Sequence, residues 1–368
     1  MAENIVLYRK YRPKNFDEII GQQHIVQTLT NSINNEAISH AYLFTGPRGS
    51  GKTTIARIFA KAVNCLTYDV KHGPCGKCDS CLEIAAANSM DLIEIDAASH
   101  TGVDDVRELI EGIKFAPVKS KYKIFIIDEC HQLSKAASNA LLKTLEEPPA
   151  HAIFLLATTE SHKMLPTIIS RCQRFDFKRL HAQEIIQKLE FILKKEGIKC
   201  EPPVLTLIAL NARGSFRDAE SLLDKCISFT GQDKLITLKE IKDLLGIVEV
   251  SQISTFIDFL LARNTKEAVL FLNSLVEEGI DLQEFTKTLV FYLRQLLLSK
   301  INPDLVTMEA SGLSKEEVTK MQGQAATLTD KDIQKMLELF IDAENKMKYA
   351  IILQLPLELV IVDLAHRE

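Results

Sequence analysis

One short segment near the N-terminus constrains the fold of this chain more than any other part of the sequence. Residues 46–53 are Gly-Pro-Arg-Gly-Ser-Gly-Lys-Thr, which fits the pattern G-x-x-x-x-G-K-T in full. The segment follows a β-rich run, residues 41–44, and precedes a helical stretch, residues 54–63. A strand, a glycine-rich loop and a helix in this order predict a phosphate-binding loop, because the glycines let several backbone N–H groups point at one anion.

Each part of this loop has an expected role at a nucleotide. Lys52 is expected to reach the β- and γ-phosphates, and the Thr53 hydroxyl is expected to bind Mg²⁺. The alternative is a chance glycine-rich turn, and the strand–loop–helix context argues against it. The residues expected to contact nucleotide here are Gly46, Pro47, Arg48, Gly49, Ser50, Gly51, Lys52, Thr53 and Thr54.

A pair of acids supplies the second element of the site. The apolar run 124–127 ends in Asp128 and Glu129. At the carboxyl end of a buried strand, Asp128 is expected near the Mg²⁺ and Glu129 is expected to polarise a water for attack on the γ-phosphate. Such a strand end is common by itself, but downstream of a complete phosphate loop it is the expected metal and base pair. The sequence therefore predicts a protein that binds and hydrolyses ATP or GTP.

The order of expected elements predicts an α/β domain followed by helical domains. Buried strands alternate with helices up to about residue 178, which favours a parallel sheet covered by helices on both faces. Nearly all of the remaining sequence has helical periodicity. We expect three domains, over residues 1–178, 179–245 and 246–368. The expected strands are 41–44, 92–95, 123–127 and 152–157, and the expected helices are 54–63, 103–113, 138–146, 182–195, 216–229, 250–261, 265–278, 281–299, 330–347 and one that ends near residue 366.

Composition limits the class of protein. The 368 residues are 46% hydrophobic and 25% charged, as in folded globular proteins. No apolar run reaches the ~20 residues of a membrane-spanning helix, and the N-terminus lacks a signal-peptide core. A cytoplasmic location is therefore expected. The net charge of -5 argues weakly against a basic nucleic-acid-binding domain but says nothing about a local patch.

Four of the eight cysteines form a cluster with the spacing C-x9-C-x2-C-x2-C. Cys65, Cys75, Cys78 and Cys81 supply four thiolates, which can complete a closed, structural Zn²⁺ site. An iron–sulfur cluster and a set of free buried thiols are the alternatives. The absence of a Cys-Pro partner favours zinc over the iron–sulfur cluster.

Several further segments resemble one family of nucleotide machines. Asp128-Glu129-Cys130-His131 resembles the acidic box of AAA+ ATPases, and Ser170-Arg171-Cys172 resembles the Ser-Arg-Cys signature of sliding-clamp loaders. With residues 214–219 and the cysteine cluster, the whole chain is similar to the gamma/tau family of clamp-loader ATPases in bacterial DNA polymerase III. The resemblance implies an AAA+ P-loop ATPase domain with a parallel sheet, a small helical lid domain and an all-α C-terminal collar domain that oligomerises the complex.

The resemblance also assigns roles within the nucleotide site. Arg171 matches the arginine finger that reaches the γ-phosphate of a neighbouring subunit, and Arg217 matches the second sensor, which acts in cis. Thr158 and Thr159 match the first-sensor position, where Thr158 is favoured. An N-terminal segment wraps the adenine base in the family and corresponds here to Tyr8, Arg9, Tyr11, Arg12 and Pro13. A basic disordered tail is the alternative for that segment.

Cofactors and partners follow from the same resemblance. It implies ATP, Mg²⁺ and Zn²⁺, and as partners the other clamp-loader subunits in a hetero-pentameric ring, the sliding clamp and primer–template DNA. Backbone-directed DNA contacts need no net positive chain, and the candidates are Ser99, His100, Thr101, Ser134, Lys135 and Lys143. Many family members carry Arg or Lys where this chain has His100 and Gly102, so that contact is expected to be weaker. A solvated helix face is the alternative for Lys135 and Lys143.

The mechanism implied by the resemblance couples ATP to the shape of the ring. The ATP-bound shape would bind and open the clamp, and DNA would trigger hydrolysis and release. In the family, a longer form contacts the polymerase and the replicative helicase through an extension beyond the region that this chain covers. Two other classes stay open: an AAA+ helicase or remodelling ATPase, and a non-catalytic scaffold subunit of the same assembly. The cysteine cluster and Ser170-Arg171-Cys172 argue against the first, and the intact Lys52, Asp128 and Glu129 argue against the second.

Overall fold

The computed structural model of the chain describes residues 5–70, 73–99, 111–231, 235–244, 249–302 and 315–365. It divides into two compact units, Met1–Thr237 and Leu238–Glu368. The candidate DNA contacts His100 and Thr101 lie outside the described residues, as does most of the helix expected over residues 103–113.

The first unit contains a five-stranded sheet in the order β2-β3-β4-β1-β5, in which every pair of neighbouring strands is parallel. The strands are β1 (Ala41–Thr45), β2 (Leu92–Asp96), β3 (Lys123–Asp128), β4 (Ala152–Thr158) and β5 (Gln173–Asp176). Because all strands run the same way, the segments after β1, β3 and β4 meet at one edge of the sheet, where open α/β sheets bind their ligands. Thr45 at the end of β1 is the Cα partner of Thr158 at the end of β4.

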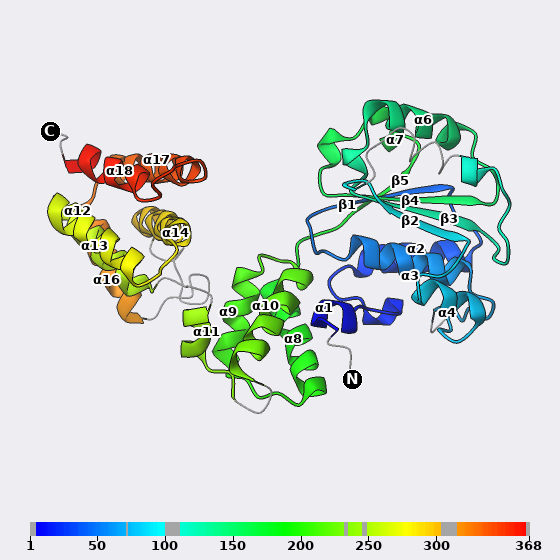
Figure 1. Cartoon of the computed structure of the whole chain (residues 1–368), viewed down its shortest axis with the longest axis horizontal. Helices are drawn as coiled ribbons and strands as arrows, with labels where there is room; N and C mark the ends of the chain where they lie inside the picture. The colour runs from blue at the N-terminus through cyan, green and yellow to red at the C-terminus, as the bar shows by residue number, and fades with distance from the viewer. Residues whose placement is uncertain are drawn as a thin grey trace. The chain divides into compact units, whose positions relative to one another are not determined.

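Helices cover both faces of this sheet (Figure 1), as the sequence predicts. Side chains alternate between the faces along each strand: Tyr42 and Phe44 pack with α2 (Gln23–Asn34) and α3 (Lys52–Val63). Ala41 and Leu43 belong to the second cluster, under α6 (Lys135–Glu146) and α7 (Pro166–Ile169). Strands β1, β3 and β4 are buried on both faces, which accounts for their nearly uninterrupted apolar sequences.

Three helices follow the sheet within the first unit: α8 (Ala182–Glu196), α9 (Pro202–Asn211) and α10 (Phe216–Thr230). The N-terminal helix α1 (Leu7–Lys10) packs against α10. Ser215 caps α10 by accepting a hydrogen bond from the backbone of Asp218, and α8 ends at Gly197 in the left-handed conformation. Helices α8 and α10 match helices predicted from the sequence, whereas α2, α9 and β5 were not predicted. The short helix α4 (Asp79–Ala85) is also missed.

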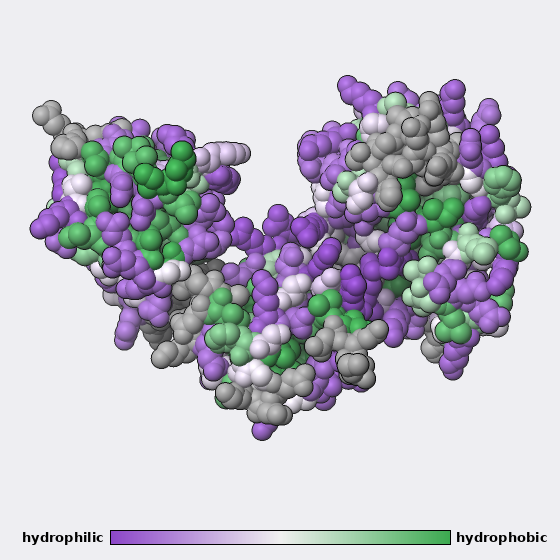
Figure 2. Space-filling view, in the orientation of Figure 1, coloured by the Kyte–Doolittle hydropathy of each residue, from purple (hydrophilic) through white to green (hydrophobic). Residues whose placement is uncertain are grey.

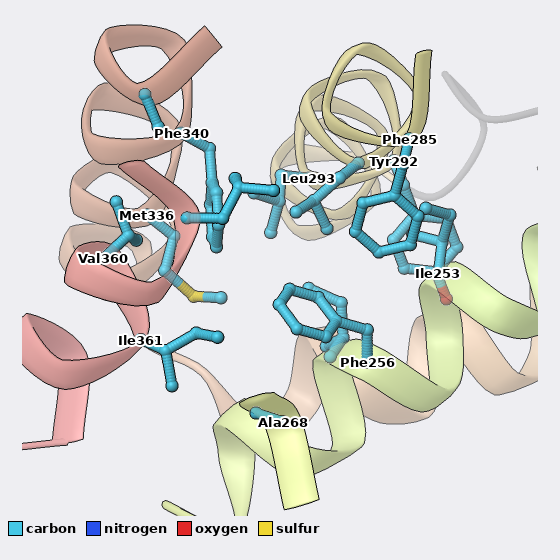
Figure 3. Close-up of a cluster of buried hydrophobic side chains, with 14 of the residues drawn as sticks. Ile253, Phe256, Ala268, Phe285, Tyr292, Leu293, Met336, Phe340, Val360 and Ile361 are labelled. Atoms are coloured by element: carbon cyan, nitrogen blue, oxygen red, sulfur yellow. The ribbon is translucent and has the colours of Figure 1, made fainter. Parts of the chain in front are cut away.

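In its described residues, the second unit is built from helices. They are α11 (Leu238–Leu244), α12 (Val250–Leu261), α13 (Thr265–Glu277), α14 (Leu282–Ile301), α16 (Lys315–Thr327), α17 (Asp330–Met347) and α18 (Leu355–Ala365). Their core centres on Phe256, which meets the rings of Phe285 and Phe340 edge to face at 5.3 Å and 6.3 Å (Figure 3). A buried polar network crosses it, in which Tyr292 donates to Gln324 at 2.7 Å and Gln324 donates to the Ser254 carbonyl at 2.9 Å. The all-α prediction for this region is confirmed.

The surface of the chain carries both hydrophobic and hydrophilic residues. Figure 2 shows hydrophobic residues gathered in patches among hydrophilic ones on both units. Among the described residues, no helix combines the length and the hydrophobicity that crossing a membrane requires.

Candidate nucleotide site and cysteine cluster

The loop between β1 and α3 has the conformation of a phosphate-binding loop. Gly46, Gly49 and Gly51 have φ values of +147°, +74° and +98°, a region that favours glycine. The Lys52 side chain turns back into the loop, where Nζ donates to the carbonyls of Gly46 at 2.8 Å and Pro47 at 2.9 Å. The loop and its lysine thus form the compact cradle that the motif predicts.

Burial sets the charge balance around this lysine. Lys52 is only 5% exposed, and its burial lowers the pKa of the ammonium. The negative charges of Glu129 and Asp128 act in the opposite direction and favour the protonated form. An ammonium held in a buried loop beside two acids is available as a counter-charge for phosphate.

The predicted magnesium ligands lie together. The Thr53 hydroxyl donates to Asp128 Oδ2 at 2.6 Å, and the backbone N–H of Glu129 donates to Asp128 Oδ1 at 3.0 Å. A hydroxyl and a carboxylate are oxygen ligands of the kind that Mg²⁺ prefers. These two residues fit a magnesium ion coordinated jointly with nucleotide phosphates.

Glu129 accepts hydrogen bonds from Thr159, whereas the Thr158 hydroxyl pairs with His131, whose Nδ1 is also 3.5 Å from Glu129 Oε2. Glu129 has a φ of +46°, a conformation that is uncommon for a residue with a side chain. Its Oε2 accepts from the Thr159 N–H at 3.1 Å and from the Thr159 hydroxyl at 2.9 Å. The Thr158 hydroxyl is buried and pairs with His131 Nδ1 at 2.9 Å and with the Glu160 N–H at 3.0 Å. The first-sensor role of Thr158 remains a prediction, and this geometry favours Thr159 instead.

The N-terminal segment lies between the phosphate-loop helix and the helices that follow the sheet. Arg12 Nε donates to Thr54 Oγ1 at 3.1 Å on α3. Tyr11 donates to Glu196 on α8, and Lys188 of α8 donates back to the Tyr11 carbonyl at 3.1 Å. These contacts, together with α1, are not those of a disordered tail.

The aromatic and basic side chains of this segment lie near α10. The Tyr8 ring lies 5.2 Å from the Arg217 guanidinium carbon and 5.8 Å from that of Arg9. Burial lowers the pKa of Arg12, and the charge of Arg57 lowers it further, whereas Glu94 and Asp128 raise it. Four of the five predicted base-wrapping residues, Tyr8, Arg9, Tyr11 and Arg12, therefore have identified contacts in this region.

Helix α10 rests directly on the phosphate loop. The Phe216 N–H donates to the Gly49 carbonyl at 3.2 Å. A Cβ atom on Gly49 would lie 1.9 Å from Ser215 Oγ, so the two backbones are in close contact. Arg217 follows one residue later. In the sequence these residues belong only to a family signature, which does not predict the contact. The helix-capping Ser215 is the local signal that a helix starts there.

The polar contacts of Arg171 are with residues outside the phosphate loop. Its NH1 group donates to the Thr167 carbonyl at 2.8 Å and to Ser170 Oγ at 3.4 Å, and its NH2 group donates to Glu146 at 2.7 Å. In the part of the chain that the structure describes, these are its polar contacts. The guanidinium is partly exposed and is therefore open to a neighbouring molecule.

The described DNA candidates are accessible to different degrees. Ser99, Lys135 and Lys143 are exposed. The Ser134 hydroxyl caps α6 by accepting from the Ala137 N–H at 3.2 Å. Lys135 and Lys143 share helix α6 with that cap, so the start of this helix presents both a positive charge and its N-terminal N–H groups.

The four predicted cysteines converge. Their sulfur atoms all lie within 4.8 Å of one another, and Cys75 Sγ is 3.9 Å from Cys81 Sγ. A tetrahedral zinc site with bonds of about 2.3 Å has sulfur–sulfur edges of about 3.8 Å, so the spacing fits zinc. Backbone N–H groups of Lys77 and Cys78 donate to Cys75 Sγ at 3.4 Å and 3.3 Å.

The pKa shifts of these thiols differ in direction. Hydrogen bonds from the Thr67 hydroxyl and from two backbone N–H groups lower the pKa of Cys75 to about 5. Burial raises the pKa of Cys65 and Cys81, because a lone thiolate is disfavoured there. A divalent cation would hold all four sulfurs as thiolates. The cluster is separate from the phosphate loop and follows the end of α3.

Fold and site together define a class. The chain combines a parallel sheet with a phosphate loop after β1, an acid pair after β3 and a helical lid on the loop. This combination defines an AAA+ P-loop ATPase. Family comparisons agree along the sequence. Residues 21–181 match the DNA polymerase III delta subunit family, 184–232 match the ATPase lid domain of the DNA polymerase III clamp loader subunit, and 236–368 match domain III of DNA polymerase III subunits gamma and tau.

The chain belongs to the DNA polymerase III gamma/tau family. It is 47% identical to the tau subunit of Bacillus subtilis over 299 residues, which are 81% of this chain and 53% of the relative. It is 38% identical to the Escherichia coli tau subunit over 345 residues, 94% of this chain and 53% of the relative. It is 41% identical to the gamma subunit of Buchnera aphidicola over 300 residues, 82% of this chain and 80% of that subunit.

The chain thus spans about half the length of the tau subunits that it matches. Among solved structures, the RuvB branch-migration motor of Thermotoga maritima aligns with a TM-score of 0.47 and 18% identity, over 68% of this chain and 79% of that chain. A similarity at this level carries no inference about this chain.

Proposed function

We propose that this chain is the ATPase subunit of a bacterial replicative clamp loader within the DNA polymerase III holoenzyme. ATP binding would drive assembly and opening of the sliding clamp on primed DNA, and hydrolysis triggered by DNA would release the clamp. The observation that carries the proposal is the contact of the lid helix with a complete phosphate loop, in a chain whose three successive segments match DNA polymerase III families.

The side chains at the sheet edge divide the work on the nucleotide. Lys52 neutralises the β- and γ-phosphates, and Thr53 and Asp128 hold Mg²⁺. The metal ion, when bound, withdraws charge from the transferring phosphoryl group. Arg217, which follows the contact between α10 and the loop, would contact the same phosphates from the lid. The N-terminal segment supplies aromatic and basic groups to the adenine base.

Glu129 is the proposed general base. Its Oε2 accepts two hydrogen bonds from Thr159, which leaves Oε1 free to accept from an attacking water. Thr159 is well placed to register the γ-phosphate, because its hydroxyl lies 2.9 Å from that carboxylate. We therefore assign the first-sensor role to Thr159 rather than to Thr158.

A ring arrangement would account for the contacts of Arg171, which are with residues outside the phosphate loop. A partly exposed guanidinium can reach a triphosphate bound to the next subunit and stabilise the charge on the transferring phosphoryl. The other clamp-loader subunits, the sliding clamp and primer–template DNA are the proposed partners. Helix α6 offers Lys135 and Lys143 to the DNA backbone. The collar is the proposed oligomerisation domain, and Zn²⁺ at the cysteine cluster is structural.

The domain boundaries belong to the same proposal. The first compact unit would comprise the ATPase domain and the lid, and the second would be the collar. The lid family match over residues 184–232 supports a division of the first unit near residue 179.

A binding experiment on the purified chain tests the nucleotide site. Titration calorimetry with Mg-ATP should show binding by the wild type, none by Lys52→Ala and normal binding by Glu129→Gln. Lys266→Ala is a matched control, because this lysine is exposed on the second unit. Equal affinity in the wild type and Lys52→Ala would contradict the site.

A further inference from the structure

Arg171 is anchored by two elements that meet near the end of α7. Its NH1 group donates at 2.8 Å to the Thr167 carbonyl, which lies at the end of α7 and also accepts from the Ser170 hydroxyl at 3.1 Å. Its NH2 group donates to Glu146 Oε1 at 2.7 Å, at the last residue of α6. The guanidinium is thus fixed on two of its three nitrogen atoms by two separate helices.

We propose that Glu146 is a positioning residue that orients Arg171 for the γ-phosphate of a neighbouring subunit. The proposal rests on the trans-acting role of Arg171 in the proposed function. It assigns to Glu146 the task of holding the plane of the guanidinium before the neighbouring subunit and its nucleotide arrive.

The contacts leave donors free for the phosphate. A guanidinium has five N–H groups in one plane, and Nε makes no hydrogen bond within the described part of the chain. The Arg171 side chain is 34% exposed, so the free edge is open to an incoming anion. Orientation before contact matters because a long, flexible side chain otherwise loses rotamer freedom as it engages the transition state.

The ion pair between Arg171 and Glu146 is weak enough to orient the guanidinium without preventing its contact with a phosphate. The Glu146 side chain is 51% exposed, and an ion pair in such a setting is weak because water screens it. The charge of a bound triphosphate exceeds that of one carboxylate, so Arg171 can engage it without first breaking a buried pair. The contact to Thr167 remains in place as the carboxylate adjusts.

Helix α6 connects this carboxylate to the rest of the site. The helix starts beside the acidic box, just after Ser134, and ends at Glu146. It also carries Lys135 and Lys143, which are proposed to face DNA. A shift of α6 on DNA would therefore move the support of Arg171, because a helix of this length moves as one body.

The test compares Glu146→Ala with Glu147→Ala in the reconstituted complex with clamp and primed DNA. The neighbouring Glu147 is also exposed and has no side-chain partner among the described residues, so it is a matched control. We expect Glu146→Ala to lower kcat about fivefold, the scale of an exposed ion pair, with KM for ATP unchanged. Glu146→Gln should fall between this variant and the wild type, because the amide oxygen still accepts a hydrogen bond. Glu147→Ala should match the wild type.

A double-variant cycle separates positioning from a general structural effect. In an Arg171→Ala background, Glu146→Ala should produce no further loss, because the group that it positions is gone. An equal loss of kcat in both backgrounds would overturn the proposal. So would a kcat that Glu146→Ala leaves unchanged or raises, and a raised kcat would mean that Glu146 restrains Arg171. If Arg171→Ala alone leaves turnover unchanged, the trans-acting role itself fails and this inference fails with it, whereas a loss with Arg171→Ala but none with Glu146→Ala overturns only the role of Glu146.

Discussion

Replacing Gly49 with alanine would test whether the lid must rest on the phosphate loop. Gly49 has a φ of +74°, and a Cβ atom there would lie 1.9 Å from Ser215 Oγ and 2.8 Å from Ser215 Cβ. Contacts below 3.0 Å are essentially never seen for real Cβ atoms, so Ser215 Oγ has to move by more than an ångström and the rest of Ser215 by a few tenths. That movement would break the hydrogen bond from the Phe216 N–H to the Gly49 carbonyl.

The size of the effect follows from two contributions. A positive φ costs a residue with a side chain about 1–2 kcal/mol. The lost hydrogen bond costs about 1 kcal/mol more. The strain counts against folding whether or not the lid is closed, so only the lost hydrogen bond acts on lid closure, which should become less favourable by about 1 kcal/mol, a factor of about 5 in its equilibrium. Gly197→Ala is the matched control, because Gly197 has a φ of +72° and a Cβ atom there meets nothing within 4 Å.

Urea denaturation and Mg-ATP titration together separate strain from lid contact. Both variants should lose about 1–2 kcal/mol of unfolding free energy through strain, but only Gly49→Ala should lose nucleotide affinity, by about fivefold. Adding Ser215→Gly removes the clashing atoms and should restore part of that affinity. Equal affinities in the two glycine variants, or no recovery with Ser215→Gly, would refute the reasoning.

Three further predictions address the base, the metal and the lid. Glu129→Gln removes the group that accepts the proton of the attacking water, so single-turnover hydrolysis should fall at least about 100-fold while Mg-ATP affinity is kept; wild-type turnover would contradict this role. Cys81→Ser should purify with less zinc, measured by atomic absorption, and should unfold at a lower temperature, whereas Cys130→Ser, outside the cluster, should keep its metal; equal zinc in both would contradict the cluster. Burial raises the pKa of Glu220 to about 7 from 4.5, and the nearby Lys188 only partly opposes the rise. The stability that this acid contributes is present below about pH 4.5 and is lost as the pH rises through 7. The unfolding free energy of Glu220→Gln should therefore exceed that of the wild type by up to about 3 kcal/mol at pH 8 and by less at pH 5. A difference that does not vary with pH would contradict the burial of this acid.

Local sequence was sufficient to predict the parts of the site that are set by the order of elements along the chain. The loop over residues 46–53 and the acid pair each follow an apolar strand, and the parallel sheet brings these strand ends to one edge. The four cysteines lie close together in the chain, so their spacing was enough to predict that they converge.

The parts that depend on tertiary packing could not be predicted in the same way. Strand β5 presents only Phe175 to the core, so it lacks the apolar run that marks the other strands. Thr158 and Thr159 are adjacent in the sequence, so their different roles depend on where β4 ends. In the structure Thr158 is buried against His131, whereas Thr159 contacts Glu129. Contacts between distant segments, such as that of Ser215 with the phosphate loop, leave no local pattern.

Turnover of the reconstituted complex tests the central claim most directly. ATP hydrolysis would be measured with the chain and its partner subunits alone, with primed DNA, with the sliding clamp and with both together. We expect the highest rate with both together, and its loss in Arg171→Ala with Mg-ATP binding retained. Stimulation by DNA that does not depend on the clamp would indicate a translocating motor, and no hydrolysis under any condition would indicate a scaffold; either result would contradict the assignment as a clamp-loader ATPase.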